Sequence, residues 1–397
     1  MKPVGKERLG DWHISDPVLT SREQSVLQSA VEFVQAHVSP NADRWELERH
    51  VPEPVLKQAA AAFAGLLVPS DVGGLGLPVA TAATLLGELA RGDLAFAFSL
   101  VVHINLTNTV ARYGTEAQRA RYLPGLLSGE TFGAFCLTEP GAGSDVAGIQ
   151  TEAHSEPGGW HLTGEKAWVS NAVFANLLSV YVRLPGSDPV SRRAANAYQD
   201  IGCFLVPAER QGILRVPAYE LLGSHILGTA GLRFEDCPVT EEDLLFPAGE
   251  GFKAALGGID LARVLLSAMC CAVLAQALDV AREYARRRQA FGRSTLDFQG
   301  LQWQLAEIAT HLEAARLLTS KAADRLDRGE SATLAAAHAK KYATRAAFDG
   351  VSAAMQVMGA AGLKRDCPLP RQLANARTAQ ILDGTSEIQN IVISRHL

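Results

Sequence analysis

The sequence lacks an excess of basic charge. It has 37 lysines and arginines against 42 aspartates and glutamates, so the formal net charge of the 397-residue chain is -5 at pH 7. This balance provides no extended positive surface for a nucleic-acid backbone. We therefore expect no nucleic-acid partner, and any phosphate contact should come from single arginines.

Cysteines are few and follow no pairing pattern. The six cysteines include no C-x-x-C pair and no repeated short spacing, which argues against a disulfide framework. We interpret them as small buried residues of a protein in a reducing compartment, and we expect a cytoplasmic location and no metal site.

Targeting and membrane segments are also missing. The first residues, MKPVGKERLGDWHISD, have no apolar stretch of the signal-peptide kind and carry acids that a transit peptide avoids. The longest apolar run, Val264 to Leu278, is about 15 residues long, which is short for a bilayer span. We expect a buried helix there and no membrane.

What the chain does have is length, apolar content and three blocks of different periodicity. With 397 residues, of which 48% are apolar, it can form two or three domains with a sizeable core. From Thr20 to about Gly129 the apolar spacing is helical, with a capping box at Thr20 and Glu23 and a helix end before Pro40. From Gly133 to about Pro247 short strands are predicted, at 177–184, 201–206 and 231–234, with a surface loop at 185–200.

The third block returns to long helices. One is predicted from Ile259 to Arg287, a second carries a heptad-like stripe from Leu301 to Ala315 and ends near Gly329, and a third is capped by Ser331 and runs to Gly359. Such stripes need partner helices, which predicts a four-helix bundle that buries its remaining apolar surface against other subunits. The predicted fold is α+β and mostly α, with a helical domain at 1–130, a β-domain at 131–247 and a four-helix bundle at 248–397.

Two segments carry the chemical signal. Phe135 to Asp145 reads FCLTEPGAGSD, and its hydroxyls and glycines can bring side chains and bare backbone against a flat heterocycle. Ile381 to Asn390 reads ILDGTSEIQN and places a carboxylate, Asp383, directly before Gly384 and Thr385. Together they indicate a flavin and an enzyme that oxidises carbon.

The chain resembles the acyl-CoA dehydrogenase family over nearly its whole length. The resemblance implies an N-terminal helical domain, a central β-domain and a C-terminal four-helix bundle, assembled as a homotetramer with bound FAD. The motifs occur in the family's order: TEPGAGSD, KAWVSN at Lys166 to Asn171, RRRQAFG at Arg286 to Gly292, FQ at Phe298 and Gln299, QVMGAAGL at Gln356 to Leu363, and DGTSEIQ. No P-loop or G-x-G-x-x-G after a strand competes for the nucleotide.

The resemblance implies a set of FAD contacts. Trp168 supplies a rigid apolar wall and Ser170 a hydroxyl near the reactive N5, whereas Arg288 reaches the pyrophosphate from a neighbouring subunit. The full set is Phe135, Leu137, Thr138, Gly143, Ser144, Trp168, Ser170, Arg288, Phe291, Phe298, Gln299, Gln356, Gly359, Ala360, Thr385 and Glu387. Ala360 replaces the second of the family's two glycines, and Glu387 stands where glutamine is frequent.

On the substrate side the resemblance implies an acyl-thioester site. Its residues are Ser144 near the pantetheine arm, Asp260 and Arg263 facing CoA, Gly384, and His103 near the acyl tail. His103 is also open to interpretation as a core histidine. His225 replaces the arginine that meets a CoA phosphate in the family, and Phe96 stands in the neighbourhood where members that use glutaryl substrates have arginine.

Asp383 is the candidate base. In the family a carboxylate removes the α-proton of the thioester while the β-hydride passes to the flavin. Most members use glutamate at this position and others place it on the long helix, where this chain has Ala262. Aspartate is one methylene shorter, and a misplacement of about 1 Å costs on the order of 100-fold in rate.

The predicted function is therefore FAD-dependent α,β-dehydrogenation of an acyl thioester, carried by CoA or by acyl carrier protein, with electrons leaving to an electron-transfer flavoprotein. Two alternatives stay open. Nitroalkane oxidases share the fold and use aspartate here, although their arginine seven residues later is replaced by Asn390. The chain could also be a catalytically silent flavoprotein or partner subunit, with Asp383 as a helix-end residue.

Overall fold

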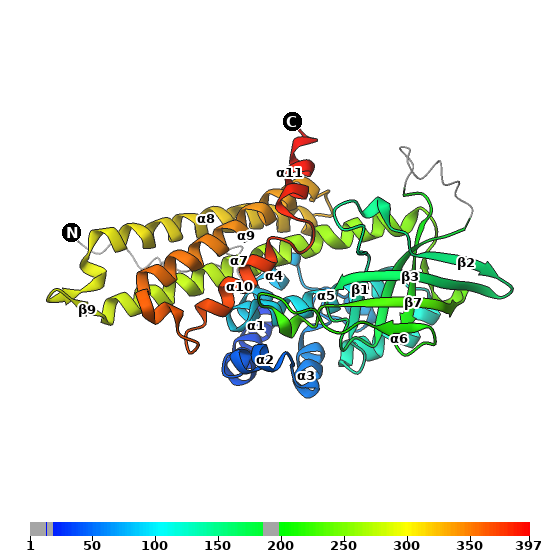
Figure 1. The fold of residues 1–397 in the computed structure, drawn as a ribbon, viewed down its shortest axis with the longest axis horizontal. Helices are drawn as coiled ribbons and strands as arrows, with labels where there is room; N and C mark the ends of the chain where they lie inside the picture. Colours follow the sequence, from blue (N-terminus) through cyan, green and yellow to red (C-terminus); the bar gives the residue numbers. More distant parts are fainter. Residues whose placement is uncertain (1–12, 14–18, 186–197) are drawn as a thin grey trace.

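The computed structural model describes His13, residues 19–185 and residues 198–397 (Figure 1). A helical part, a sheet and a second helical part follow one another along the chain, which confirms the predicted fold class. The N-terminal helices are α1 (Ser21–Phe33), α2 (Ala42–Glu48), α3 (Glu53–Phe63), α4 (Val79–Gly92), α5 (Leu94–Tyr113) and α6 (Glu116–Ser128).

The start and end of α1 follow the local sequence signals. The Thr20 hydroxyl accepts a hydrogen bond from the Glu23 backbone N–H at 3.3 Å, and a Glu23 carboxylate oxygen accepts from the Thr20 N–H at 2.8 Å, which confirms the capping box. A π-helical turn, Val34–Val38, continues the helix. It ends before Pro40 as predicted, because proline cannot donate the next backbone hydrogen bond.

The central part is one sheet of eight strands. Its path is β6-β7-β3-β2-β4-β5-β8, and β1 pairs with β4 in parallel. The two longer predicted strands are present, the predicted 231–234 strand extends at both ends, and most of the predicted 185–200 loop lies outside the described residues. The strands are β1 (Gly133–Cys136), β2 (Glu152–Glu156), β3 (Gly159–Val169), β4 (Leu177–Arg183), β5 (Ile201–Pro207), β6 (Ile213–Arg215), β7 (Ala230–Val239) and β8 (Leu244–Phe246).

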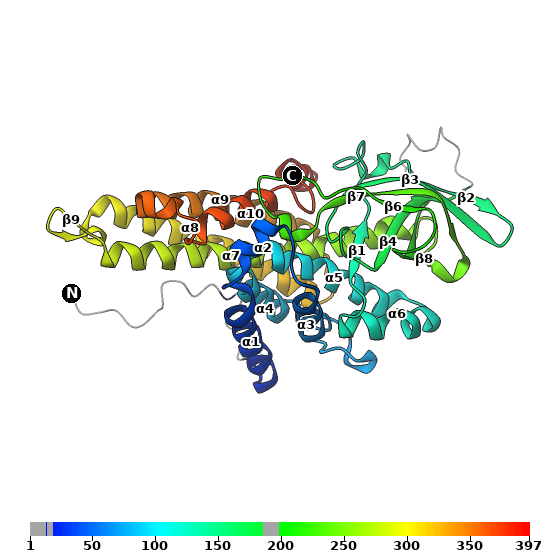
Figure 2. The ribbon, with the colours of Figure 1, turned by 60° about the horizontal axis from the view of Figure 1, so that its bottom comes forward.

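The C-terminal part is a helical bundle whose far end lies opposite the sheet in both ribbon views (Figures 1 and 2). A small hairpin of β9 (Gln289–Ala290) and β10 (Arg293–Ser294) closes that end, which we call the bundle tip. The last helix projects from the body and carries the C-terminus. The helices are α7 (Glu250–Arg287), α8 (Gln299–Asp327), α9 (Thr333–Met358), α10 (Leu369–Ala379) and α11 (Ser386–Ser394).

Two predicted helix starts are wrong. The long helix α7 begins at Glu250, not at Ile259, because packing outweighs the low helix propensity of its glycines. A side chain at Gly251 would approach the Ile201 carbonyl oxygen to 2.8 Å, so only glycine allows the helix to pass β5 this closely. The N-cap of α9 is Ala332, without a side-chain hydrogen bond, so Ser331 does not cap it.

The apolar segment of α7 is a buried core helix, as predicted, but the argument from its length was wrong. Within the described residues, α5 and α7 are both long and apolar enough to cross a bilayer. In the fold, 78% and 83% of their apolar windows are buried. Burial of α7 against α4, α8 and α9, and of α5 against α4, α6 and α7, accounts for their hydropathy, as it does for core helices generally.

Candidate active site

The segment around Asp383 is a tight turn between α10 and α11. Asp383 has φ 52° and Gly384 has φ 92°. The left-handed region costs glycine little, whereas an aspartate there is held by its surroundings. We call residues 380–385 the Asp383 loop.

Side chains from three helices hold this loop by its backbone carbonyls. The Arg263 Nε of α7 donates to the Asp383 carbonyl at 2.9 Å. The Lys340 Nζ of α9 donates to the carbonyls of Gln380 at 2.9 Å and Gly384 at 2.7 Å. The Gln389 Nε2 of α11 also donates to the Gly384 carbonyl, at 2.8 Å. These bonds fix the backbone on both sides of Asp383.

The Asp383 carboxyl group itself is left with a free acceptor. Its Oδ2 is shielded from solvent and has no hydrogen-bond partner among the described residues. Burial raises the pKa of Asp383 to about 6, although the positive charges of Lys340 and Arg263 lower it. A carboxylate with an unused acceptor and a pKa near neutrality suits a general base.

Asp260 and Arg263 meet this loop from the start of α7. Both are buried, and the Arg263 Nη1 donates to the Asp260 Oδ1 at 2.9 Å. The second Asp260 oxygen accepts from the Thr333 hydroxyl at 2.6 Å. The charged groups of Asp260 and Arg263 thus bind each other, and Arg263 also binds the Asp383 loop. Their contact with CoA stays a prediction.

A second group of predicted residues lies in the β-domain. The strand β3 has an irregularity between Lys166 and Val169, and within it Trp168 takes φ 57° and leaves 57% of its surface exposed. A bulge of this kind turns a side chain out of the sheet. The Ala167 N–H donates to the Thr138 carbonyl at 2.8 Å, which holds the two motifs side by side. Ser170, just beyond, is buried.

A buried ion pair joins these two motifs, and the sequence reasoning had given it no role. The Lys166 Nζ donates to the Glu139 carboxylate at 2.7 Å and to the Leu137 carbonyl at 3.1 Å. Burial opposes the charge of Glu139, but Lys166 and the backbone N–H groups of Gln150 and Thr151 lower its pKa overall. Glu139 lies in the TEPGAGSD motif and Lys166 in the KAWVSN motif, so the sequence pointed to both residues but not to their pairing.

The other residues of the first motif differ in exposure. The side chain of Leu137 is buried in the core, and Phe135 packs against Tyr181 with ring centroids 4.9 Å apart. Gly143 and Ser144 lie in the exposed turn after β1. A side chain added at Gly143 would meet only the methyl group of Thr138, at 3.8 Å, so this face is open to a ligand.

A third group lies at the bundle tip, far from the sheet (Figures 1 and 2). Arg286 and Arg287 both pair with Glu283, whereas Arg288 has no ion pair within the described part of the chain. Phe291 takes φ 51° and is 94% exposed. Its ring meets Phe298 edge to face, with centroids 6.0 Å apart, and Gln299 opens α8 beside them. Within one chain these residues therefore lie far from β3, the strand that carries Trp168 (Figures 1 and 2).

The remaining predicted contacts lie along α9 and α11. Gln356, Gly359 and Ala360 are at the C-terminal end of α9, in the half of the bundle that carries the tip (Figure 1). Thr385 and Glu387 open α11 and line a cleft of 830 Å³ beside the Asp383 loop. Basic side chains, namely Lys341, Arg345 and Arg377, together with His311 and His338, line the same cleft.

These residues fit FAD. The exposed aromatic rings of Trp168 and Phe291 offer flat apolar contacts, and the β-domain hydroxyls offer hydrogen bonds to a polar ring. Arg288 offers a guanidinium with no ion-pair partner among the described residues, which suits a phosphate. These residues lie at two ends of the folded molecule. A binding site for one FAD would therefore need residues from a second copy of the chain.

One predicted substrate residue is wrong. His103 is fully buried, and its two ring nitrogens bind the Leu126 carbonyl at 3.0 Å and the Gly133 N–H at 3.1 Å. Burial lowers its pKa to about 4, and its ring stacks on Phe132 at 4.3 Å. It is a core histidine with no atom left for an acyl chain.

His225 and Phe96 are also occupied by the protein. The ring of His225 binds a Glu46 carboxylate oxygen through Nδ1 at 2.7 Å and accepts the Leu221 N–H at Nε2, so it anchors its loop to α2. Phe96 is fully buried among aromatic residues of the helical domain. Neither offers a charge to a ligand.

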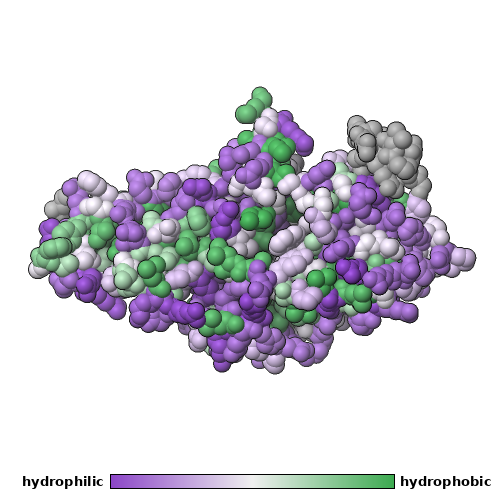
Figure 3. Space-filling model, viewed as in Figure 1, coloured by the Kyte–Doolittle hydropathy of each residue, from purple (hydrophilic) through white to green (hydrophobic). Residues whose placement is uncertain are grey.

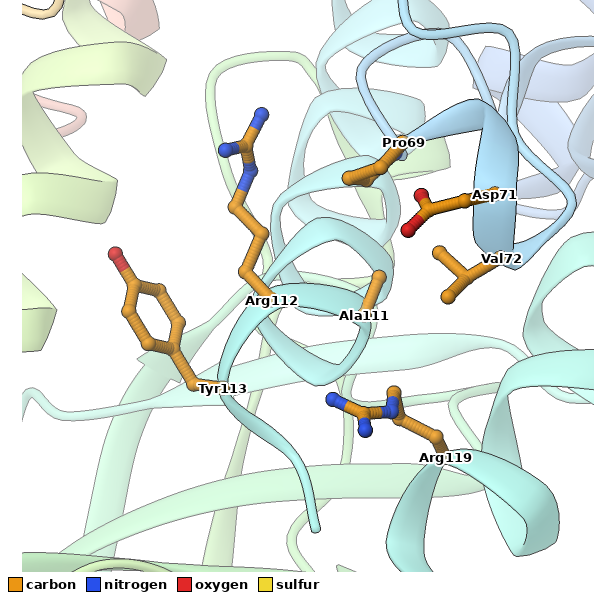
Figure 4. Close-up of a pocket in the computed structure, with 7 residues that line it drawn as sticks. All are labelled: Pro69, Asp71, Val72, Ala111, Arg112, Tyr113 and Arg119. Carbon is orange, nitrogen blue, oxygen red and sulfur yellow. The ribbon is translucent and has the colours of Figure 1, made fainter. Parts of the chain in front are cut away.

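A smaller pocket of 440 Å³ lies where α5 meets α6 and the turn before α4 (Figure 4). Arg112, Tyr113 and Arg119 line it opposite Asp71. None of the predicted site residues does so, and we assign the active site to the Asp383 loop. Among residues 13, 19–185 and 198–397 no cluster of histidine, cysteine, aspartate or glutamate could hold a metal ion.

Comparisons with known proteins agree over nearly the whole chain. Residues 20–130, 134–237 and 249–397 match the N-terminal, middle and C-terminal domains of acyl-CoA dehydrogenase. The human mitochondrial short-chain specific acyl-CoA dehydrogenase is 33% identical over 381 residues, covering 96% of this chain and 90% of the relative.

Two solved structures superpose closely. Butyryl-CoA dehydrogenase from Megasphaera elsdenii has a TM-score of 0.90 and 29% identity, covering 96% of this chain and 99% of that one. A chain from the structure of the electron transferring flavoprotein of Acidaminococcus fermentans has a TM-score of 0.90 and 32% identity with the same coverage.

Proposed function

Since the chain belongs to the acyl-CoA dehydrogenase family and is an FAD-dependent oxidoreductase, we propose that it desaturates an acyl thioester between the α and β carbons with Asp383 as the base. The observation that carries this proposal is the unused, shielded Asp383 Oδ2 on a loop held by three helices. A carboxylate without a protein partner is costly unless a ligand uses it.

Each group of residues has a separate role in the proposed reaction. Asp383, in its charged form, accepts the α-proton of the thioester, and Arg263 and Gln389 hold its backbone in place while it does so. Thr138, Trp168 and Ser170 of one subunit and Arg288 of another would hold FAD, which would supply the acceptor for the β-hydride. Exclusion of water from the shielded Asp383 Oδ2 strengthens the basicity of the carboxylate.

Aspartate in place of the usual glutamate has a consequence for the substrate. Its carboxylate is one methylene nearer the backbone, so the α-carbon must approach the Asp383 loop more closely. The left-handed backbone at Asp383 and the firm anchoring of the loop leave little room for the protein to move instead. We infer a preference for acyl groups that fit this shifted position.

The test is Asp383→Asn, which keeps the shape and removes the proton acceptor. We expect reduction of the bound flavin by an acyl-CoA panel under anaerobic conditions to fall at least about a hundredfold while FAD stays bound. Asp366→Asn is the control, because Asp366 forms an exposed ion pair with Lys364 and lies outside the Asp383 loop. Wild-type kinetics in the Asp383 variant would refute the assignment.

A nitroalkane panel, run on the same proteins, examines the alternative chemistry that aspartate at this position permits. The variant Asp383→Glu helps to separate thioester desaturation from nitroalkane oxidation. With a thioester substrate the longer side chain should be tolerated or should change the preferred acyl chain. Oxidation of nitroalkanes but of no thioester would exclude desaturation.

We also propose an electron acceptor, an oligomeric state and a location for the protein. Electrons leave to an electron-transfer flavoprotein, supported by the close match to a chain from the structure of such a flavoprotein. The protein works as a homotetramer in the cytoplasm on a CoA or carrier-protein thioester. Support for assembly comes from the divided FAD residues, and support for a reducing compartment comes from six free, buried cysteines.

A further inference from the structure

Lys340 is the one lysine of α9 that is completely buried. It lies on the alanine-lined face of the helix, between Ala336, Ala343 and Ala347. Burying an ammonium group in such surroundings is expensive unless it has a defined task. The neighbouring Lys341 is exposed, so a solvated position was available one residue away.

The contacts of Lys340 are directed at the loop that carries the base. Its ammonium group donates to the carbonyls of Gln380 and Gly384, which stand three residues before and one residue after Asp383. Lys340 therefore brackets Asp383 along the chain. Its own pKa is lowered to about 8 by burial, and the Asp383 charge is the strongest influence that raises it.

We propose that Lys340 is the positioning residue of the catalytic carboxylate: its ammonium group ties the backbone on both sides of Asp383 and keeps the carboxylate charged before the thioester arrives. This inference rests on the proposed role of Asp383 as base. It assigns to Lys340 two effects, a mechanical one through two carbonyls and an electrostatic one through its charge.

The other groups around the loop do not duplicate this charge. Arg263 of α7 also lowers the pKa of Asp383, but its guanidinium is shared with the carboxylate of Asp260. Glu387 of α11 is exposed and negative. Cys270 of α7 is a neutral thiol, since burial raises its pKa. Lys340 is thus the cation near Asp383 without a carboxylate of its own among the described residues.

The experiment compares Lys340→Gln with wild-type FAD-loaded protein. Glutamine can keep one hydrogen bond to a carbonyl and removes the charge. We expect the pH at which flavin reduction rises to half its maximum to move upward by about one unit or more, because an adjacent opposite charge lowers a carboxyl pKa by roughly that amount. Lys253→Gln, an exposed lysine of α7, should leave this pH unchanged.

A second measurement does not depend on turnover. The backbone N–H groups of Ile381 and Leu382 bind the Thr378 carbonyl, and their hydrogen exchange reports on the loop. We expect exchange in Lys340→Gln to become about tenfold faster or more, through loss of bonds from a charged donor. If this variant fails to retain FAD, Lys340→Met replaces it, since methionine fills the space of the lysine stem and adds no polar group to the buried face.

The proposal is overturned if the half-maximal pH of the variant stays at the wild-type value, whatever the exchange shows, because a purely structural lysine would loosen the loop without moving that pH. Failure of the base assignment is distinguishable. In that case Asp383→Asn keeps wild-type kinetics, whereas failure of the Lys340 proposal leaves Asp383→Asn inactive.

Discussion

Asp383 combines three properties that ordinary surface aspartates do not share. It has a left-handed backbone, an oxygen without a partner, and a pKa raised by burial. Each makes the folded state less stable, and sites that carry such costs are commonly functional. Lys340 and Arg263 offset part of the cost through the loop carbonyls.

The raised pKa predicts a pH-dependent stability. The folded protein holds the Asp383 proton up to about pH 6, whereas the unfolded chain releases it near pH 4. Stability contributed by this residue is therefore present at low pH and is lost as the pH rises from about 4 to about 6. Asp383→Asn removes this term, so its stability relative to wild type should increase across that interval by on the order of 1 to 3 kcal/mol.

Paired thermal unfolding of wild type and Asp383→Asn at matched pH between 4.5 and 7.5 checks this sign. Comparison at each pH cancels the titration of all other groups. A difference in midpoint that is constant across the range would show that Asp383 titrates at its ordinary pKa.

Among the secondary-structure elements, β3 and the segment after β1 depend on one another. The bulge of β3 exposes Trp168, and the buried pair of Glu139 and Lys166 ties that strand to the segment that carries Thr138. Removing one partner of a buried ion pair leaves the other charge uncompensated. The exposed position of Trp168 is thus supported from inside the β-domain.

Glu139→Gln should lower the stability of the protein by about 3 to 5 kcal/mol and weaken FAD retention, because Lys166 stays buried without its partner. Thermal unfolding and FAD release on dilution measure the two effects. Glu156→Gln is the matched control, since that residue is exposed and its contact with His161 is at the surface. A Glu139 variant that behaves like the control would remove the ion pair from this role.

Taken as a whole, one molecule of this protein carries the residues that we expect to bind FAD at two distant ends. The β-domain and the Asp383 loop lie on one side and Arg288 and Phe291 at the bundle tip (Figure 1). Apolar side chains remain exposed along the bundle and on α11, as Figure 3 shows, among them Trp303 of α8 at 62% and Ile391 of α11 at 45%. Both features predict a closed, symmetric assembly.

Subunit complementation tests this division directly. Arg288→Ala should weaken FAD binding and Asp383→Asn should block reduction, so each homo-oligomer is impaired. In a mixed pair, one site takes Asp383 from one subunit and Arg288 from the other, and about half of the sites should recover. Co-expression with two affinity tags and flavin reduction of the doubly purified fraction measures this recovery.

Arg286→Ala serves as the control variant, because Arg286 pairs with Glu283 at the surface and should leave FAD bound. Mixed oligomers no more active than the average of their parents would place the whole FAD site within one chain.

Local signals in the sequence were sufficient for much of this molecule. The capping box at Thr20, the strand at 177–184 and the long apolar helices follow from hydrogen bonds and periodicities within a few residues of each other. The ordered motifs likewise identified the family. Residues that are close in the sequence stay neighbours in any fold, so their interactions can be inferred without knowing the tertiary structure.

Contacts between distant segments needed the coordinates. The burial of His103, the start of α7 at Glu250 and the carbonyl bonds from Lys340 each depend on residues 23 to 50 positions away along the chain. A lysine amid alanines at positions 336, 343 and 347 was a visible signal, but its partners were not. Whether a polar group is paired, strained or free depends on which segments packing brings together, and a one-dimensional pattern does not contain that information.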